Sequence, residues 1–253
     1  MDFAAQFHHL FTLDGLISLL TLAVLEIVLG IDNIIFISII ASRLEHKKEQ
    51  KKARFTGLVL ALLMRVALLF AITWIIGLKE PLIDFFDFHF SGRDIILLAG
   101  GIFLLVKTTS EIHHKMEGAD DTPEEKKGKY PTIMNIVMQI VFIDIVFSFD
   151  SILTAVGIVN EVVIMIAAVI ISMVIMLIFS ESVSEFINRN PTVKMLALAF
   201  LLMIGILLVM ESFHVEVPKQ YVYSSMAFAF LVELLNMRMR KKTEKKKAHK
   251  ELD

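Results

Sequence analysis

The stretch LEIVLGIDNIIFI, residues 25–37, decides the class of this protein because it carries two carboxylates within a long apolar run. FIDIVFSFDSILTA, residues 142–155, repeats the pattern, again with two acids six positions apart. The four acids are Glu26, Asp32, Asp144 and Asp150. A charged side chain at the centre of a bilayer costs about 2.5–3.5 kcal/mol on insertion scales, so it needs a partner or a purpose. The two stretches therefore predict a membrane protein with an acidic functional site.

The composition around these stretches is also that of a membrane protein. Apolar residues make up 56% of the 253 residues, and the mean hydropathy is +0.71. A helix needs roughly 20 mostly apolar residues to cross a bilayer. Seven stretches qualify or nearly do, at approximately residues 16–41, 56–77, 95–112, 132–157, 161–183, 193–213 and 221–237. We therefore expect an all-α, polytopic protein with seven transmembrane helices and short loops.

The distribution of Lys and Arg predicts the orientation of the chain. On the seven-span scheme, 20 of the 25 Lys and Arg residues lie on one side, in the first, third and fifth connections and the C-terminal tail. Only Lys79, Arg93 and Lys219 lie on the other side, while Arg65 and Lys107 lie within spans. Because short basic connections stay in the cytoplasm, we expect a cell-membrane protein with its N-terminus outside and its C-terminus cytoplasmic.

The two acidic stretches belong to an internal repeat. Superposing them aligns the first acid of one with the first of the other, and likewise the second acids. GGIFLLVKTTSEIHH (residues 100–114) similarly echoes IGILLVMESFH (residues 204–214). The first and fourth spans cross the bilayer in opposite senses, so the predicted repeat of three plus three spans is inverted. Secondary transporters of this architecture bind their substrate near the midplane, where the repeats meet.

The repeat also predicts the division of the chain into parts. They are a first three-helix repeat (1–115), a cytoplasmic linker (116–130), an inverted second repeat (131–214), a seventh transmembrane helix (215–238) and a basic cytoplasmic tail (239–253). The linker lacks the glycine and ligand spacing of a calcium loop, so we expect a connector. The N-terminus lacks the basic region and cleavage site of a signal peptide, so no cleavable signal is expected.

The acidic pairs have the chemistry of a cation site. Four carboxylates converging from two helices would repel one another unless a cation or protons lay among them. The chain has no cysteine, and no histidine lies in the two stretches, so oxygen ligands favour Mg²⁺, Ca²⁺ or Mn²⁺ over copper or zinc. The second acid of each pair is followed by a residue with a neutral oxygen, the amide of Asn33 in one stretch and the hydroxyl of Ser151 in the other. The predicted ligands are Glu26, Asp32, Asn33, Asp144, Asp150 and Ser151.

The six-residue spacing leads to a prediction about the helices themselves. Positions six apart lie about 240° around an ideal helix, so the two acids of one pair would not share a face. Gly30 and Ser148 stand between the acids at equivalent places. We therefore expect local unwinding near residues 29–31 and 147–149, which would also free carbonyl oxygens for an ion.

A purely structural role is the alternative to an ion site. The acids would then only pair with the buried cations Arg65 and Lys107. Four acids leave two carboxylates over once both cations are used, so the cation site is favoured. Arg65 is expected to act as a counter-ion, and Lys107 to extend toward the cytoplasmic edge of the membrane.

Five motifs occur in order along the chain: LEIVLGIDNIIFI, GRDIILLAGGIFLLVKTTSEIH, DIVFSFDSILTA, PTVKMLALAFLLMIG and LVELLNMRMRKK. Together, over about residues 10–237, they resemble the TerC/Alx family of membrane proteins, in the LysE-type transporter group. The resemblance implies metal-ion homeostasis, especially manganese export, with the same six residues forming the site. It also implies a basic residue at Lys194 in the second repeat, with a counterpart near Arg93 and Asp94. No segment resembles the CBS domain of some larger relatives, so regulation by one is not expected.

The favoured function is therefore a secondary transporter that exports divalent metal cations, Mn²⁺ first and Ca²⁺ as the alternative ion. The same acids permit proton exchange. A second hypothesis is a membrane assembly or metallation partner for secreted proteins, working with the secretion machinery. A third, a di-aspartyl intramembrane protease, is disfavoured because Gly30-Ile31-Asp32 lacks the further glycine of that motif. We expect no enzyme, and with a net charge of −2 no nucleic-acid partner.

Overall fold

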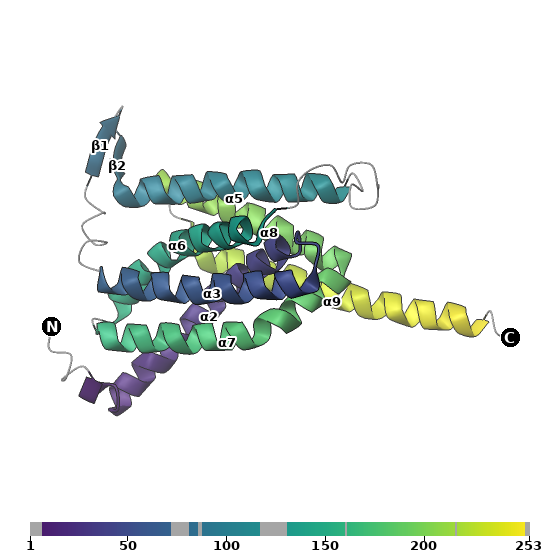
Figure 1. The fold of residues 1–253 in the computed structure, drawn as a ribbon, viewed down its shortest axis with the longest axis horizontal. Coiled ribbons are helices and arrows are strands. Elements are labelled where there is room, and N and C mark those ends of the chain that lie inside the picture. The colour runs from purple at the N-terminus through teal and green to yellow at the C-terminus, as the bar shows by residue number, and fades with distance from the viewer. Residues whose placement is uncertain are drawn as a thin grey trace.

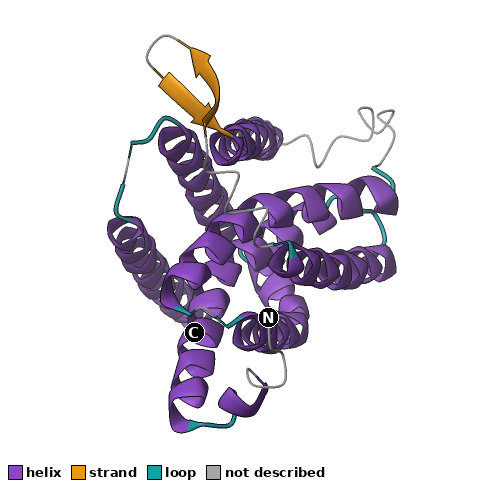
Figure 2. Ribbon diagram, turned by 90° about the vertical axis from the view of Figure 1, so that its left-hand side faces the viewer, coloured by secondary structure: helices purple, strands orange, loops and turns teal. Residues whose placement is uncertain are grey.

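A computed structural model describes residues 7–71, 81–85, 88–116, 131–159, 161–215 and 217–250 of the protein. Within these ranges the chain forms seven helices of at least 22 residues and one antiparallel hairpin (Figures 1 and 2). The helices are α2 (Leu13–Ala41), α3 (Lys47–Phe70), α5 (Gly92–Met116), α6 (Ile133–Ile158), α7 (Val162–Arg189), α8 (Pro191–Ser212) and α9 (Lys219–Lys250). The strands are β1 (Pro81–Phe85) and β2 (Phe88–Ser91).

Five of these helices are long and apolar enough to cross a membrane, namely α2, α3, α5, α7 and α8. In α6 the shorter segment Ile133–Phe149 is apolar. Large apolar side chains also remain on the outside of the bundle, as a lipid-facing surface requires. The chain is therefore a polytopic and mainly helical membrane protein, and the count of seven spans stays a prediction.

Three features of the fold differ from the sequence expectation. Helix α3 begins at Lys47, so most of the predicted first connection is a charged extension of the second helix. Helix α9 continues without a break to Lys250, so the predicted seventh span and basic tail form one helix. The β1–β2 hairpin stands where only a short loop was predicted, and its aromatic residues suit paired strands. The predicted linker lies largely outside the described residues.

The largest helix–helix contacts join a helix of one predicted repeat to a helix of the other. The most extensive contacts join α2 to α7, α3 to α6, and α5 to α8. The first helix of each repeat thus packs on the second helix of the other, and the two third helices pack on each other. Helix α9 packs mainly on α8 and extends away from the bundle (Figure 1).

Glycines allow the close approach of α5 and α8. A Cβ placed on Gly101 would lie 2.9 Å from the carbonyl oxygen of Gly205, and one on Gly205 would lie 3.3 Å from the carbonyl oxygen of Gly101. Small residues bring membrane helices into direct backbone contact in this way. The two glycines occupy matching positions in the repeated motifs at residues 100–114 and 204–214.

The helix ends that precede or follow the basic connections lie together. Arg43, just after α2, pairs with Glu111 near the end of α5. Lys51 Nζ, in the first turns of α3, lies 2.8 Å from Glu181 Oε2 near the end of α7. These pairs bring the α2–α3 connection and the ends of α5 and α7 to one end of the bundle.

Candidate cation site

The predicted ligands lie on α2 and α6, which contact each other. The described side chains among them are all no more than 4% exposed: Glu26, Asp32, Asn33, Asp144 and Ser151. The backbone of Asp150 lies in α6, but its side chain is outside the part of the chain that the structure describes. Three carboxylates buried in an apolar bundle need compensation by charge or hydrogen bonds.

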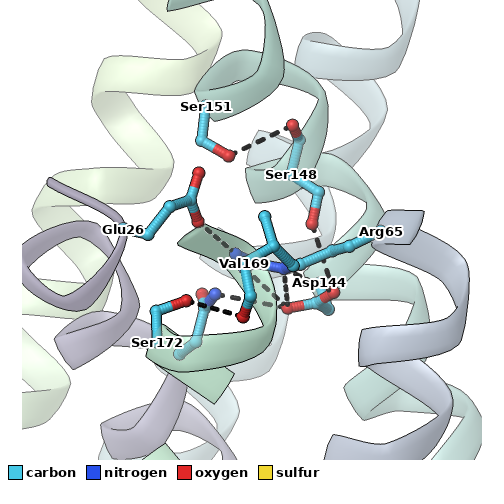
Figure 3. Close-up of polar contacts among 8 residues, drawn as sticks. Glu26, Arg65, Asp144, Ser148, Ser151, Val169 and Ser172 are labelled. Carbon is cyan, nitrogen blue, oxygen red and sulfur yellow. Dashed lines mark hydrogen bonds and ion pairs between the residues drawn. The ribbon is translucent and has the colours of Figure 1, made fainter. Parts of the chain in front are cut away.

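Arg65 of α3 compensates two of these carboxylates (Figure 3). Its Nη1 donates to Glu26 Oε2 at 2.6 Å and its Nη2 donates to Asp144 Oδ1 at 2.9 Å. Its Nε lies 3.2 Å from both carboxylate oxygens of Asp144. A planar guanidinium can serve two carboxylates because its five N–H donors point in several fixed directions. The counter-ion role predicted for Arg65 is confirmed, and it binds the first acid of each repeat.

Lys107 does not share this role. Its ammonium lies 5.9 Å from the centre of the Phe103 ring on α5, and no ion pair joins it to any side chain that the structure describes. The purely structural alternative required both cations to neutralise the acids. In the described part of the chain, one arginine serves two acids and the lysine serves none of them.

Asp32 is a buried carboxylate that Arg65 does not bind. No hydrogen bond or ion pair joins its side chain to another residue within the described ranges. Asp32 instead lines a small cavity of about 50 Å³ together with Asn33, Arg65 and Ser151. A cavity of this size has room for an ion or a few water molecules.

Asn33 and Ser151 offer this cavity neutral oxygens. The Asn33 amide nitrogen donates to Asp144 Oδ1 at 3.3 Å, whereas its Oδ1 is buried without a hydrogen-bond partner in the described structure. Leaving a buried acceptor unsatisfied costs about 1–3 kcal/mol. The Ser151 hydroxyl donates to the Ser148 carbonyl at 3.2 Å, which leaves the lone pairs of its own oxygen for an incoming donor or cation.

The predicted unwinding of the two helices is wrong. Helix α2 is continuous over Leu13–Ala41, and helix α6 over Ile133–Ile158. The prediction assumed that both acids of a pair must reach one site. Glu26 and Asn33, seven positions apart, instead share the helix face that meets Arg65 and Asp144, and Asp32 turns toward the cavity.

The residues expected to break the helices have other roles. Gly30 lies against the Met176 side chain of α7, where a Cβ would collide with the sulfur, so it permits close packing of α2 on α7. The Ser148 hydroxyl donates to Asp144 Oδ2 at 3.2 Å, one helical turn away. Neither role requires a break in the backbone hydrogen bonds.

The described side chains alone do not complete a metal site. Among them no three His, Asp or Glu residues form a group that could hold a metal ion. Asp32, Asn33 and Ser151 come together at the cavity, while Glu26 and Asp144 are held by Arg65. The six-residue metal site therefore stays a prediction.

The cavity also reaches residues that the sequence did not single out. Glu211 at the end of α8 and Tyr223 on α9 line it. Glu211 Oε1 accepts a hydrogen bond from Arg93 Nη2 at 2.6 Å. A signal was present, because Glu211 falls within the repeated motif and Arg93 is one of the few basic residues predicted on its side of the membrane.

One known protein family matches most of this chain. The family described as "Integral membrane protein TerC family" matches residues 11–248. The chain belongs to the TerC family. The family resemblance expected from the five motifs is thereby confirmed, and it covers this chain from α2 into α9.

Several relatives are similar to this chain over most of its length. The "UPF0053 inner membrane protein YoaE" of Escherichia coli (strain K12) is 50% identical over 218 residues, which are 86% of this chain and 42% of YoaE. A "UPF0053 protein" of Haemophilus influenzae is 44% identical over 228 residues, 90% of this chain and 95% of that protein. The "UPF0053 inner membrane protein YgdQ" of E. coli (strain K12) is 45% identical over 222 residues, 88% of this chain and 92% of YgdQ. The chain thus spans less than half of YoaE but nearly all of the other two. No solved structure matches.

Proposed function

We propose that this TerC-family protein is a secondary transporter that exports divalent metal cations by alternating access, with Mn²⁺ as the favoured substrate. One observation carries the proposal. Arg65 neutralises the first acid of each repeat, while Asp32 faces a buried cavity with no cationic partner among the described residues.

The charge of this cluster favours a bound cation. Glu26, Asp144 and Arg65 together leave one net negative charge when ionised, and Asp32 adds a second. Such a centre is unstable in hydrocarbon unless a cation or protons neutralise it. A divalent ion supplies the needed charge in one step. Protons on the same carboxylates would supply it after the ion leaves, which is the chemical basis for proton exchange.

The ligand types favour a hard or borderline ion. Asp32, Asn33 and Ser151 offer carboxylate, amide and hydroxyl oxygens, and the whole chain has no cysteine. Oxygen ligands of this kind suit Mn²⁺, Mg²⁺ and Ca²⁺. Preference for Mn²⁺ rests on the family resemblance, with Ca²⁺ as the alternative.

The packing of the helices supports the inverted repeat. In a two-fold related pair of three-helix units, a contact of the first helix with the second helix of the other unit must occur twice. The contacts of α2 with α7 and of α3 with α6 are such a pair. The α5–α8 contact joins the third helices of the two units, where Gly101 and Gly205 lie against each other. Transporters with this symmetry move one repeat against the other around a fixed site.

The proposed orientation places the N-terminus outside and the C-terminus in the cytoplasm. The α2–α3 connection and the ends of α5 and α7, which precede or follow the basic connections, lie at one end of the bundle and support this assignment. The relatives YoaE and YgdQ are named inner membrane proteins, so we assign this chain to the inner membrane as well.

The test is removal of the second acid of each predicted pair. In Asp32→Asn plus Asp150→Asn, efflux of Mn²⁺ from loaded cells should be lost, while Glu185→Gln, at an exposed carboxylate near the end of α7, should keep it. Purified protein should gain thermal stability from Mn²⁺, because a ligand that binds only the folded state stabilises it, and the double variant should not. Unchanged efflux in the double variant would contradict the proposal.

The two alternatives predict different outcomes for the same variant. An assembly partner for secreted proteins would lose that assembly while metal efflux stayed unchanged. A di-aspartyl protease would lose peptide cleavage. The structure counts against the protease, because Asp144 is bound by Arg65 and cannot readily share a proton with a second aspartate.

A further inference from the structure

Three contacts join the start of α5 and the strand before it to the C-terminal end of α8. They are a T-shaped ring pair between Phe90 and Phe213 with centres 5.8 Å apart, the 2.6 Å hydrogen bond from Arg93 to Glu211, and a 3.0 Å contact between His214 Nε2 and Asp94 Oδ2. We call residues 90–94 together with 211–214 the seam. The seam is formed by the β2–α5 junction on one side and the last turn of α8 on the other.

One part of the seam is a fixed anchor. Asp94 is 2% exposed, and its Oδ2 accepts hydrogen bonds from the Ser91 amide at 2.9 Å and the Ser91 hydroxyl at 2.7 Å. The same oxygen contacts His214, whose φ of 59° turns the chain out of α8. These bonds tie the end of β2, the start of α5 and the end of α8 together.

The Arg93–Glu211 pair differs from this anchor because it borders the cavity of the candidate cation site. Glu211 lines the same cavity as Asp32 and Ser151, and Leu207, one helical turn before Glu211, lines it as well. Both side chains of the pair are 21% exposed, so they lie between the buried acids and the surface. A cation that left Asp32 along this cavity would next meet the Glu211 carboxylate.

Arg93 has a second carboxylate within reach. Its Nη1 lies 4.0 Å from Asp94 Oδ1, whereas the hydrogen bonds of Asp94 to Ser91 and His214 use Oδ2. The guanidinium can therefore leave Glu211 and remain beside an acid. The position beside Asp94 lowers the free-energy cost of moving Arg93 off the Glu211 carboxylate, which then becomes available to a mobile cation.

We infer that the Arg93–Glu211 ion pair gates the cation path at this end of the protein. Arg93 is a tethered cation that occupies the carboxylate to which the transported divalent cation binds next. The cation displaces Arg93 toward Asp94, and Arg93 returns to Glu211 when the cation has left. The gate deepens the proposed function and rests on it, because it acts on the same cavity and the same class of ion.

The natural absence of cysteine allows a direct test. Leu207→Cys places one thiol inside the cavity, and its reaction with a membrane-impermeant thiosulfonate can be timed in intact cells. Adding Arg93→Gln or Glu211→Gln should speed labelling at least about tenfold, the shift expected when the closed state loses one charge-assisted hydrogen bond. The control Arg189→Gln breaks an exposed ion pair near the end of α7 and should change the rate less than about twofold.

A variant with the two charges exchanged distinguishes loss of the ion pair from misfolding of the protein. Arg93→Glu with Glu211→Arg restores the pair in reverse, and slow labelling should return. If neither single change speeds labelling, or if labelling speeds only when the reagent is on the cytoplasmic side of inverted vesicles, the gate is overturned.

Cation protection separates the gate from the proposed function. In the Leu207→Cys, Arg93→Gln protein, Mn²⁺ should slow labelling, and adding Asp32→Asn should abolish that protection. Faster labelling without any protection by Mn²⁺ would keep the pair as the closure of the cavity but would overturn its role for a cation. Loss of efflux in the Asp32 and Asp150 variant with no effect of Arg93→Gln on labelling would uphold the proposed function and refute the gate.

Discussion

Replacing Arg65 by Gln should strongly destabilise the protein. Arg65 is 3% exposed and donates to Glu26 at 2.6 Å and to Asp144 at 2.9 Å. Removing one partner of a buried ion pair leaves an uncompensated charge and costs about 3–5 kcal/mol. Arg65→Gln strands two carboxylates, so we expect a loss at the upper end of that range. For a chain of this length it corresponds to a fall of about 10 °C or more in Tm.

The measurement is thermal unfolding of the purified protein in detergent, followed by near-ultraviolet circular dichroism. Arg65→Lys should fall between the parent and Arg65→Gln, because an ammonium lacks the planar set of donors that serves both carboxylates. Arg189→Gln is the matched control. Its ion pair with Glu185 is exposed, so we expect a change below about 1 kcal/mol.

A compensating variant tests the reasoning itself. If the cost of Arg65→Gln is the stranded charge, adding Glu26→Gln and Asp144→Asn should recover much of the lost stability. A triple variant no more stable than Arg65→Gln would show that the shape of the arginine, and not its charge, holds the cluster. A Tm of Arg65→Gln equal to that of the parent would refute the buried ion-pair account altogether.

Three further predictions follow from the packing and the polar contacts. Gly101→Ala should cost about 1–3 kcal/mol because its Cβ would lie 2.9 Å from the Gly205 carbonyl and 3.0 Å from the Val209 amide, whereas Gly205→Ala should cost less; thermal unfolding of the two proteins measures the difference. Asn33→Ala should change Tm little, since it loses one 3.3 Å hydrogen bond worth about 1 kcal/mol, yet it should weaken stabilisation by Mn²⁺; equal stabilisation in parent and variant would count against Asn33 as a ligand. Thr12→Ala should cost about 0.5–2 kcal/mol, because the Thr12 hydroxyl caps the start of α2, and an unchanged Tm would contradict that capping role.

The helices were readable from the sequence because membrane helices are long and apolar. The predicted stretches fall on the seven long helices of the described structure, but most of their ends do not coincide with the helix ends. Lys47 begins α3 and Lys250 ends α9 because charged residues continue a helix beyond the apolar core at little cost. Hydropathy marks the membrane and not the helix end, so these boundaries could not be predicted from it.

The site was partly readable for a similar reason. Burial of Glu26, Asp32 and Asp144 followed from their apolar neighbours, and the count of buried cations pointed to Arg65 as a counter-ion. Which of the acids Arg65 would bind could not be predicted, because that depends on where α3 lies relative to α2 and α6. The unwinding prediction failed on the same point, since it required Glu26 and Asp32 to reach one site, whereas Glu26 binds Arg65 and Asp32 faces the cavity.

Arg65 also breaks the symmetry that the acids create. The predicted repeat places equivalent acids on α2 and α6. Helix α7, the predicted counterpart of α3, has no Lys or Arg before Arg189 at its C-terminal end. A second arginine opposite the first would bring the cluster closer to neutrality and leave less charge for an ion. With one arginine, Glu26 and Asp144 are held in place, while Asp32 places a carboxylate at the cavity that Arg65 does not bind. Under the proposed function, this asymmetry would separate two tasks: Glu26 and Asp144 hold the helices together through Arg65, and the Asp32 carboxylate is left for the cation.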